Sequence, residues 1–229
     1  MTDSGLVSVA SHMRKLSAFL PGAHDRATIL GQTGSGKTEL ARQMLASRPF
    51  AVVLDPKRRF EAPGFRTVSD LRSLTKARES RLIFRPSHDA LREWDDVGGD
   101  IERFFEWIFR RGNTTVYVDE TYLVTRGDEM PRYYHACLTQ GRELGIATWS
   151  ATQRPMRIPQ VVLSEAEHTY AFRLQLPQDR NKVEAITGID RELLNGLPKF
   201  HFYYCAPESS SPVGPLMLSL PSVPISQFA

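Results

Sequence analysis

Residues 31–38 read GQTGSGKT and match the pattern GxxxxGK followed by Ser or Thr. An apolar run at 27–30 precedes the match, and the residues after it place Leu40 and Met44 on one helical face. A strand, a glycine-rich loop and a helix in this order form the context in which the pattern binds phosphate. The glycines let backbone N–H groups turn toward phosphate oxygens, and the start of the helix adds partial positive charge. The stretch therefore predicts a nucleotide-binding phosphate loop.

Two residues of this loop carry specific chemistry. The Lys37 ammonium is expected to reach the β- and γ-phosphates of ATP, and the Thr38 hydroxyl is expected to ligate Mg²⁺. The predicted nucleotide-binding residues are Gly31, Gln32, Thr33, Gly34, Ser35, Gly36, Lys37 and Thr38.

An acidic pair ends a second apolar run, because residues 115–120 read TVYVDE. At the carboxyl edge of a parallel sheet these two acids would lie beside the phosphate loop. Nucleotide hydrolysis needs one acid on the metal side and one base that orients water. We assign the metal role to Asp119 and the base role to Glu120.

A third strand-like run ends in polar residues, since 150–155 read SATQRP. A polar side chain at this tip could contact the γ-phosphate or the attacking water and so report whether ATP or ADP is bound. Gln153 suits this role better than Thr152. A turn or capping role remains open for both residues.

Short apolar runs alternate with helical segments through the first 155 residues. The expected strands are 27–30, 50–54, 81–84, 114–118 and 146–150. Between them, Ile101, Phe104, Phe105 and Ile108 share a helical face, and Pro131 begins a helix over 133–143. This alternation predicts an α/β fold with a mainly parallel, doubly wound sheet.

The remainder is expected to extend the edge of that sheet. A strand at 169–174 and a helix at 178–187 precede a terminal hairpin, with strands at 200–204 and 216–220 joined by a loop at 206–215. We therefore expect one domain over 1–229, with an N-terminal extension (1–25), a core (26–155) and a C-terminal elaboration (156–229).

Composition is that of a globular protein that remains in the cytoplasm. Of 229 residues, 41% are hydrophobic and 24% charged, which argues against disorder, collagen or coiled coil. No apolar run has the length of a membrane span, and no secretory leader is recognisable. Cys137 and Cys205 lack metal-site spacing and are expected to be reduced thiols, and the six histidines form no metal motif.

Positive charge is concentrated in one segment, although the net charge is only +3. Residues 57–85 hold nine basic and three acidic residues, a local excess of six positive charges. Arginine binds phosphate in a bidentate fork, so this segment is a candidate for contact with a polyanion such as nucleic acid. A solvated charged surface is the alternative.

Four motifs together resemble the FtsK/HerA superfamily of DNA-pumping ATPases: GQTGSGKT, VVLDPK at 52–57, TVYVDE, and ATQRP at 151–155. The similarity covers about residues 27–155. Many NTPases share the phosphate loop, whereas DPK combined with TQRP is more specific. The resemblance implies a RecA-like P-loop NTPase fold with an additional strand, a catalytic glutamate, and the sensor strand between the other two motif strands. It also implies ATP and Mg²⁺ as ligands and a ring of identical subunits, either a hexamer or a pentamer.

The compact plan is most similar to the genome-packaging ATPases of viruses. No sizeable N-terminal domain, membrane segment or C-terminal winged helix is expected. The resemblance implies a motor that translocates double-stranded DNA into a preformed capsid, with a capsid portal or vertex protein as partner, in the host cytoplasm or at a virion vertex. The alternatives are a cellular HerA-like or conjugation-related translocase, or an ATP-dependent switch that does not translocate DNA.

Ring motors also use a cation from a neighbouring subunit to stabilise charge on the transferred phosphoryl group. Arg142, in the run QGRELG at 140–145, stands just before the sensor strand, where similar ATPases carry an arginine near the subunit boundary. Arg154 is the main rival for this role. An ordinary ion pair near a helix end is the third interpretation of Arg142.

Overall fold

The computed structural model describes residues 19–93, 98–206 and 211–219. Most of the expected N-terminal extension, part of the expected hairpin loop, and Leu220 of its second strand lie outside these residues. The described strands are β1 (Ala27–Leu30), β2 (Ala51–Leu54), β3 (Arg66–Val68), β4 (Arg81–Phe84), β5 (Thr115–Asp119), β6 (Ala147–Thr152), β7 (His168–Phe172), β8 (His201–Cys205) and β9 (Val213–Met217). The described α-helices are α2 (Lys37–Ala46), α3 (Leu71–Lys76), α4 (His88–Arg92), α5 (Asp100–Arg111), α6 (Arg132–Thr139), α7 (Gln160–Ser164), α8 (Pro177–Thr187) and α9 (Arg191–Asn195).

Within the described residues the strands form one sheet in the order β3-β4-β2-β5-β6-β1-β7-β8-β9. Strands β1 to β7 pair in parallel, and β8 and β9 add an antiparallel hairpin next to β7. The central strands β1 and β2 are buried at every position, which matches their unbroken apolar sequences. The mainly parallel α/β fold and the C-terminal hairpin are thus confirmed.

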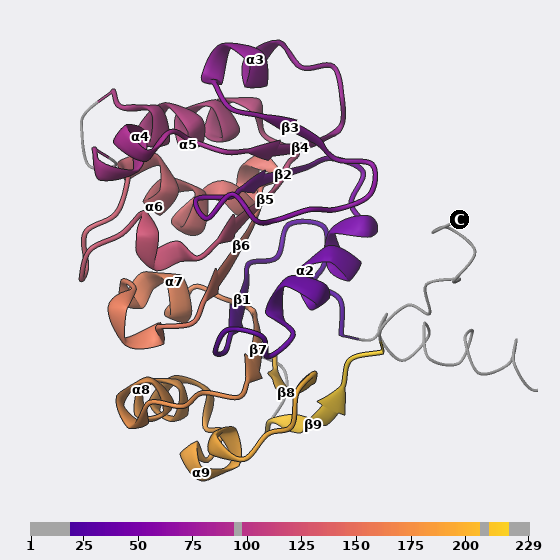
Figure 1. Cartoon of the computed structure of the whole chain (residues 1–229), viewed down its shortest axis with the longest axis vertical. Helices are drawn as coiled ribbons and strands as arrows, with labels where there is room; N and C mark the ends of the chain where they lie inside the picture. The colour runs from indigo at the N-terminus through magenta and orange to yellow at the C-terminus, as the bar shows by residue number, and fades with distance from the viewer. Residues whose placement is uncertain (1–18, 94–97, 207–210, 220–229) are drawn as a thin grey trace, which may run out of the picture.

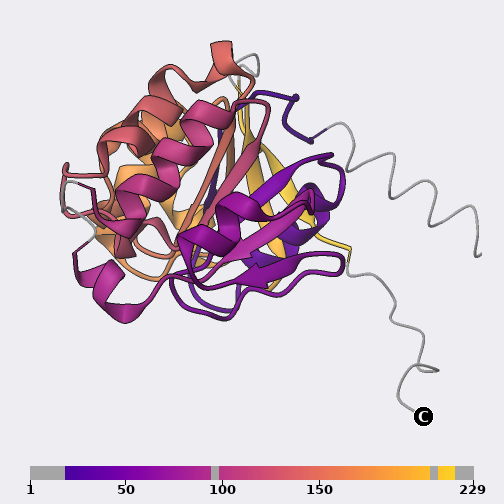
Figure 2. The same cartoon turned by 90° about the horizontal axis from the view of Figure 1, so that it is seen from above.

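Helices cover both faces of the sheet (Figures 1 and 2). On one face, Val52, Val116 and Val118 of the sheet share a core with apolar residues of α3, α5, α6, α7, α8 and α9. On the other face, Val53 and Tyr117 pack with the apolar side of α2. In Figure 1, α4 to α7 lie to the left of the sheet and α2 lies to its right. This two-sided cover leaves the carboxyl edge of the parallel strands as the place where polar loops meet.

The predicted elements agree in type and differ at their ends. Helix α5 buries Ile101, Phe104, Phe105 and Ile108, as the periodicity predicts. The helix expected over 133–143 is shorter, because α6 ends at Thr139 and a 3₁₀ turn, Gly141–Leu144, follows it. A Cβ on Gly141 would lie 3.2 Å from the Ile146 Cβ, so the chain turns tightly there to enter β6.

The second strand of the hairpin begins and ends earlier in the chain than the sequence predicts. It spans Val213–Met217 rather than 216–220, and it includes Pro215. Proline is tolerated there because β9 is the last strand of the sheet and does not need every backbone donor. Strand β7 begins at His168 and ends at Phe172, two residues before the predicted end.

Membrane spans, metal sites and disulfides can each be examined in the described part of the chain. No helix there has the length and hydrophobicity that crossing a bilayer requires. No group of three or more His, Cys, Asp or Glu side chains there is arranged to hold a metal ion. Cys137 and Cys205 are both free thiols, and burial raises the pKa of Cys137 to about 12.

Candidate active site

The sheet register brings the ends of three motif strands to one level. Leu30 of β1 lies beside Thr152 of β6, and Ala151 of β6 lies beside Asp119 of β5. The Gly31 N–H donates to the Thr152 carbonyl at 3.1 Å, so the phosphate loop starts directly beside the end of β6. The structure therefore brings the loop, the acidic pair and Gln153 together at the carboxyl edge.

The phosphate loop has a backbone that only glycine accommodates at two of its positions. Gly31 has φ 157° and Gly36 has φ 125°. A Cβ on Gly36 would lie 2.9 Å from the Phe172 ring and 3.0 Å from the Phe200 ring. These aromatic rings, from β7 and from the segment before β8, pack against the loop and leave no room for a side chain at position 36.

Lys37 is the first residue of α2 and is buried at the mouth of the loop. Its Nζ donates to the carbonyls of Gly31 at 2.6 Å and Gln32 at 3.2 Å. Burial lowers the pKa of this ammonium to about 8, and the nearby carboxylates of Glu120 and Asp119 act in the opposite direction. The Lys37 ammonium is therefore a buried cation whose charge the carboxylates of Glu120 and Asp119 balance only in part.

Asp119 ends β5 and is held by its own strand. The Tyr117 hydroxyl donates to Asp119 Oδ1 at 3.0 Å. Burial raises the pKa of the Asp119 carboxyl above its usual range, and the nearby acids Asp55 and Glu120 raise it further. A bound divalent cation would relieve this accumulation of negative charge. Carboxylate and hydroxyl oxygens such as those of Asp119 and Thr38 are the ligands that Mg²⁺ prefers, with substrate phosphates completing its shell.

Glu120 is buried and held at both carboxylate oxygens. Oε2 lies 2.5 Å from Lys57 Nζ, and Oε1 accepts from the Gln153 N–H at 2.8 Å and from the Thr152 hydroxyl at 3.2 Å. Its backbone is left-handed, with φ 79° and ψ 67°, which is rare for a residue with a side chain. Such conformations persist where surrounding contacts enforce them and concentrate at functional sites.

Gln153 connects the phosphate loop with the acidic strand. Its Oε1 accepts a hydrogen bond from the Thr33 hydroxyl, and its Nε2 donates to the Tyr122 hydroxyl at 3.3 Å. Its own backbone N–H donates to Glu120. A displacement of the phosphate loop can therefore be transmitted to Glu120 through Gln153 alone.

Lys57 is a candidate active-site residue that the sequence indicates only as part of the DPK motif and of the basic segment, with no role at Glu120. Asp55, in the same DPK motif, is fully buried and accepts from the N–H groups of Arg59 and Phe60 and from Arg85 Nε, all within 3.1 Å. These bonds fix the turn after β2. Because β2 pairs with β5, the turn places Lys57 beside Glu120. The strand order could have indicated this neighbour.

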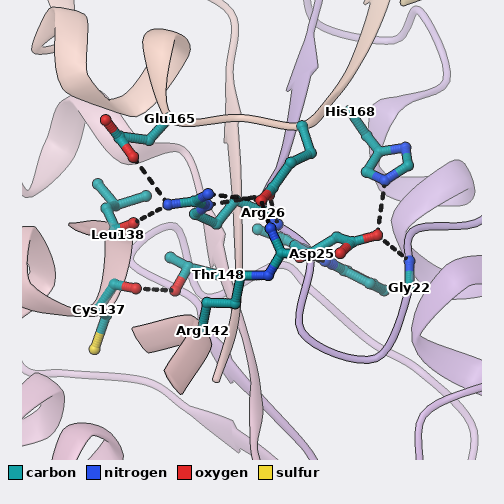
Figure 3. Close-up of polar contacts among 11 residues, drawn as sticks. Gly22, Asp25, Arg26, Cys137, Leu138, Arg142, Thr148, Glu165 and His168 are labelled. Carbon is teal, nitrogen blue, oxygen red and sulfur yellow. Dashed lines mark hydrogen bonds and ion pairs between the residues drawn. The ribbon is translucent and has the colours of Figure 1, made fainter. Parts of the chain in front are cut away.

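The two candidate trans-acting arginines are both paired with carboxylates of their own subunit. Arg142 precedes β6, at the opposite end of that strand from Gln153, and its side chain is 64% exposed. Its Nη1 lies 3.3 Å from Glu167 Oε1, in a cluster with Arg26 that Figure 3 shows. Arg154 Nε lies 3.1 Å from Asp179 Oδ2. Arg142 therefore lies at the far end of β6 from its own subunit's loop, whereas Arg154 follows Gln153 and turns its guanidinium to Asp179.

The fold and the arrangement of the motifs define a P-loop NTPase in which β6, the strand that Gln153 follows, lies between the phosphate-loop strand β1 and the acidic strand β5. No protein-family model matches the chain. Among curated proteins, the chain is 28% identical over 201 residues to the DNA packaging ATPase P9 of Enterobacteria phage PRD1, a match that covers 81% of this chain and 83% of the phage protein.

Solved structures of the same fold include two informative cases. The genome packaging NTPase B204 of Sulfolobus turreted icosahedral virus 2, in complex with AMPPCP, superposes with a TM-score of 0.65 at 16% identity and covers 84% of this chain and 97% of that chain. VirB4 of Thermoanaerobacter pseudethanolicus superposes with a TM-score of 0.65 at 10% identity and covers 86% of this chain and 90% of that chain. Both establish the fold of this chain.

Proposed function

We propose that this chain is an ATP-hydrolysing motor that moves double-stranded DNA during packaging of a viral genome. The observation that carries the proposal is the similarity to the phage DNA packaging ATPase, which extends over 81% of the chain. The site supports it independently, because the phosphate loop, the acidic pair and Gln153 lie together at one sheet edge. The reaction is ATP and water to ADP and phosphate.

The residues of the site divide the chemistry among them. Backbone N–H groups of 31–38 and the Lys37 ammonium bind the β- and γ-phosphates. Thr38 and Asp119 would hold Mg²⁺, which neutralises charge on the phosphates when bound. Glu120 accepts the proton of the attacking water, and Gln153 orients that water or the γ-phosphate. Lys57 holds the Glu120 carboxylate from its other side.

Catalysis also needs a cation on the open side of the γ-phosphate, and we propose that a neighbouring subunit supplies it. The subunits would form a closed ring, a hexamer or a pentamer. Arg142 is exposed and is our first candidate for the cation, with Arg154 as its rival. To reach a neighbour's γ-phosphate, Arg142 would have to leave or share its ion pair with Glu167. Arg154 would have to do the same with Asp179.

The basic segment at 57–85 is our candidate for the DNA contact, and its cations differ in how they are engaged within the chain. Five of its nine cations are engaged: Lys57, Arg66 and Arg85 pair with carboxylates, and Arg58 and Arg81 donate to backbone carbonyls. The exposed cations that form no ion pair within the described chain are Arg58, Arg59, Arg72, Lys76 and Arg78. These follow β2 or lie on and beside α3, and we propose that they contact DNA phosphates.

Further partners follow from the proposed task. The motor would dock on a portal or vertex protein of the capsid, either in the host cytoplasm or at a virion vertex. The deciding experiment is the ATPase rate with and without long duplex DNA. Stimulation by duplex DNA supports a translocating motor, whereas nucleotide binding with no DNA response indicates a switch.

The essential control is Glu120→Gln. The amide keeps the shape of the side chain and loses its basicity, so this variant should bind ATP and fail to hydrolyse it. Normal hydrolysis by Glu120→Gln would refute the assignment of the base.

A further inference from the structure

A small cavity adjoins the phosphate loop on the side away from the acidic pair. Its volume is ≈ 160 Å³, and its lining residues are Gln32, Gly34, Ser35, Arg173, Leu197 and Lys199. A larger cavity of ≈ 750 Å³ adjoins Glu167 and Thr169, at the start of β7, and therefore lies at the other edge of the sheet. The small cavity is the one that continues the nucleotide site.

Two cations in this cavity are fixed beside the loop by their backbones. Arg173 directly follows β7, and its carbonyl accepts from the Gln32 N–H at 2.8 Å. Lys199 precedes Phe200, whose N–H donates to the Ser35 carbonyl at 2.8 Å. The C-terminal elaboration thus forms one wall of the phosphate loop.

Neither cation has a carboxylate partner among the described residues. The ion pairs of that part of the chain include neither Arg173 nor Lys199, and both side chains are exposed. Lys199 Nζ instead lies 4.7 Å from the centre of the Phe200 ring. Arg142 and Arg154, by contrast, are both paired with carboxylates. Two unpaired cations at the rim of an anion-binding loop indicate an anionic ligand.

A second, independent observation is the hydroxyl of Ser35. The residue is buried, and its Oγ has no hydrogen-bond partner among the residues that the structure describes. Buried polar atoms are nearly always satisfied, so an orphan of this kind needs an explanation. It lines the same cavity as Arg173 and Lys199.

The direction of the nucleotide follows from the order of the strands. Glu120 and Gln153 mark the γ-phosphate end, and they follow β5 and β6, on one side of β1. The cavity lies on the other side of β1, toward β7. A nucleotide whose γ-phosphate lies near Glu120 and whose phosphates run across the loop, away from the acidic pair, brings its opposite end to the β7 side, where this cavity lies.

We propose that Arg173 and Lys199 bind the α-phosphate and the adjoining ribose of the nucleotide, with Leu197 packing against the sugar. Charged hydrogen bonds to phosphate and ribose oxygens replace water at both cations. This inference rests on the proposed function, since it takes the loop as a nucleotide site. It adds residues from outside the recognised motifs to that site.

The test compares ADP, which has the α-phosphate and ribose, with inorganic pyrophosphate, which fills the loop alone. Titration calorimetry with Mg²⁺ is carried out on the wild type and on the double variant Arg173→Gln, Lys199→Gln. We expect ADP affinity to fall about tenfold or more and pyrophosphate affinity to stay within about twofold. The charge-keeping variant Arg173→Lys, Lys199→Arg should retain most of the ADP affinity.

A matched control removes two exposed arginines on helices α5 and α6, which do not line the cavity, Arg103→Gln with Arg132→Gln, and should leave both affinities unchanged. Unchanged ADP affinity in the Arg173, Lys199 variant, or equal losses for ADP and pyrophosphate, would overturn the inference. If the double variant does not fold, the two single variants give the same comparison. A Lys37→Ala variant that binds ADP like the wild type would instead contradict the proposed function itself.

Discussion

Lys57 and Glu120 form the most constrained pair of side chains in the site. The ion pair at 2.5 Å joins a half-buried lysine to a buried glutamate whose second oxygen is held by Thr152 and Gln153. A base held on both sides is oriented before substrate arrives, which reduces the reorganisation that catalysis requires. We therefore interpret Lys57 as a residue that positions Glu120.

We predict that Lys57→Met lowers kcat at least tenfold and changes nucleotide affinity less than about threefold, because the lysine contacts the base rather than the phosphate loop. Lys57→Arg should recover part of kcat, since it restores the charge at Glu120. Steady-state kinetics combined with direct binding of ADP separate the two effects. A variant that loses affinity and kcat together would show that Lys57 supports the loop instead.

The lowered pKa of Lys37 predicts how nucleotide affinity depends on pH. In the free protein the ammonium loses its proton near pH 8, whereas bound phosphates favour the charged form. Binding above pH 8 must therefore take up a proton, and affinity should fall by up to about tenfold per pH unit there. Below pH 8 this residue contributes no pH dependence.

Calorimetry of ADP binding in buffers with different ionisation enthalpies measures that proton uptake. The Lys37→Arg variant keeps its charge over the whole range, so any binding it retains should lose the pH dependence. Equal affinity of the wild type at pH 7 and pH 9.5 would contradict the prediction.

At this scale the sequence indicates only candidate residues that lie inside contiguous motifs. Asp119, Glu120 and Gln153 each end or follow an apolar run, Lys37 belongs to the phosphate-loop pattern after another such run, and parallel strands bring the ends of these runs together. Arg173 and Lys199 lie in no motif, and their place beside the loop depends on β7 and β8 pairing next to β1. Spacing along the chain carries no information about that pairing.

Among the elements, the turn after β2 and helix α3 carry most of the exposed cations of the basic segment. Arg58 has φ 58°, and its guanidinium donates to the Pro86 carbonyl at 3.2 Å, while Arg59 is exposed. Both follow the turn that Asp55 fixes. The turn therefore holds two adjacent arginines at the same sheet edge as the nucleotide site.

We predict that replacing Arg58 and Arg59 by Glu weakens duplex DNA binding across all sequences and flattens its salt dependence. Each lost phosphate contact should reduce the slope of log affinity against log salt by about 0.9. Fluorescence anisotropy at several salt concentrations provides both quantities. Arg103→Glu with Arg132→Glu makes the same change of net charge on helices α5 and α6, outside the basic segment, and serves as the control. An unchanged slope would assign Arg58 and Arg59 to a subunit contact or to a solvated surface.

Short elements were the ones that the sequence did not reveal. Strand β3 has three residues and α3 has six, too few to establish a hydrophobic period. Helix α5, with twelve residues and one apolar face, was predicted at the correct place. The shortened end of α6 depends on how closely Gly141 packs against Ile146, a contact between parts of the fold that local propensity does not describe.

For the whole molecule, the decisive question is whether one subunit suffices for catalysis. Arg142 is exposed at the edge opposite the phosphate loop, where it can serve a neighbour and not its own site. We predict that hydrolysis rises more steeply than linearly with protein concentration as subunits assemble. Arg142→Ala should reduce turnover roughly 10³-fold with ATP affinity little changed.

Mixing Arg142→Ala with Lys37→Ala subunits is the sharper test, because one mixed interface pairs an intact loop with an intact arginine. Partial recovery of activity would establish supply between subunits. No recovery at any ratio, with assembly confirmed, would transfer the role to Arg154 or to action within one subunit.

The position of β7 has a consequence for any attempt to reduce this protein to its motifs. Every recognised motif lies before residue 156, yet β7 pairs with β1 along its whole length, from Ala27 to Leu30. A fragment that ends at 155 would expose one side of β1 as an open row of backbone donors and acceptors beside an apolar surface. Such edges recruit other strands, so we expect this fragment to aggregate rather than bind nucleotide, which light scattering would reveal. The shortest stretch that contains the motifs is therefore not a unit that can fold.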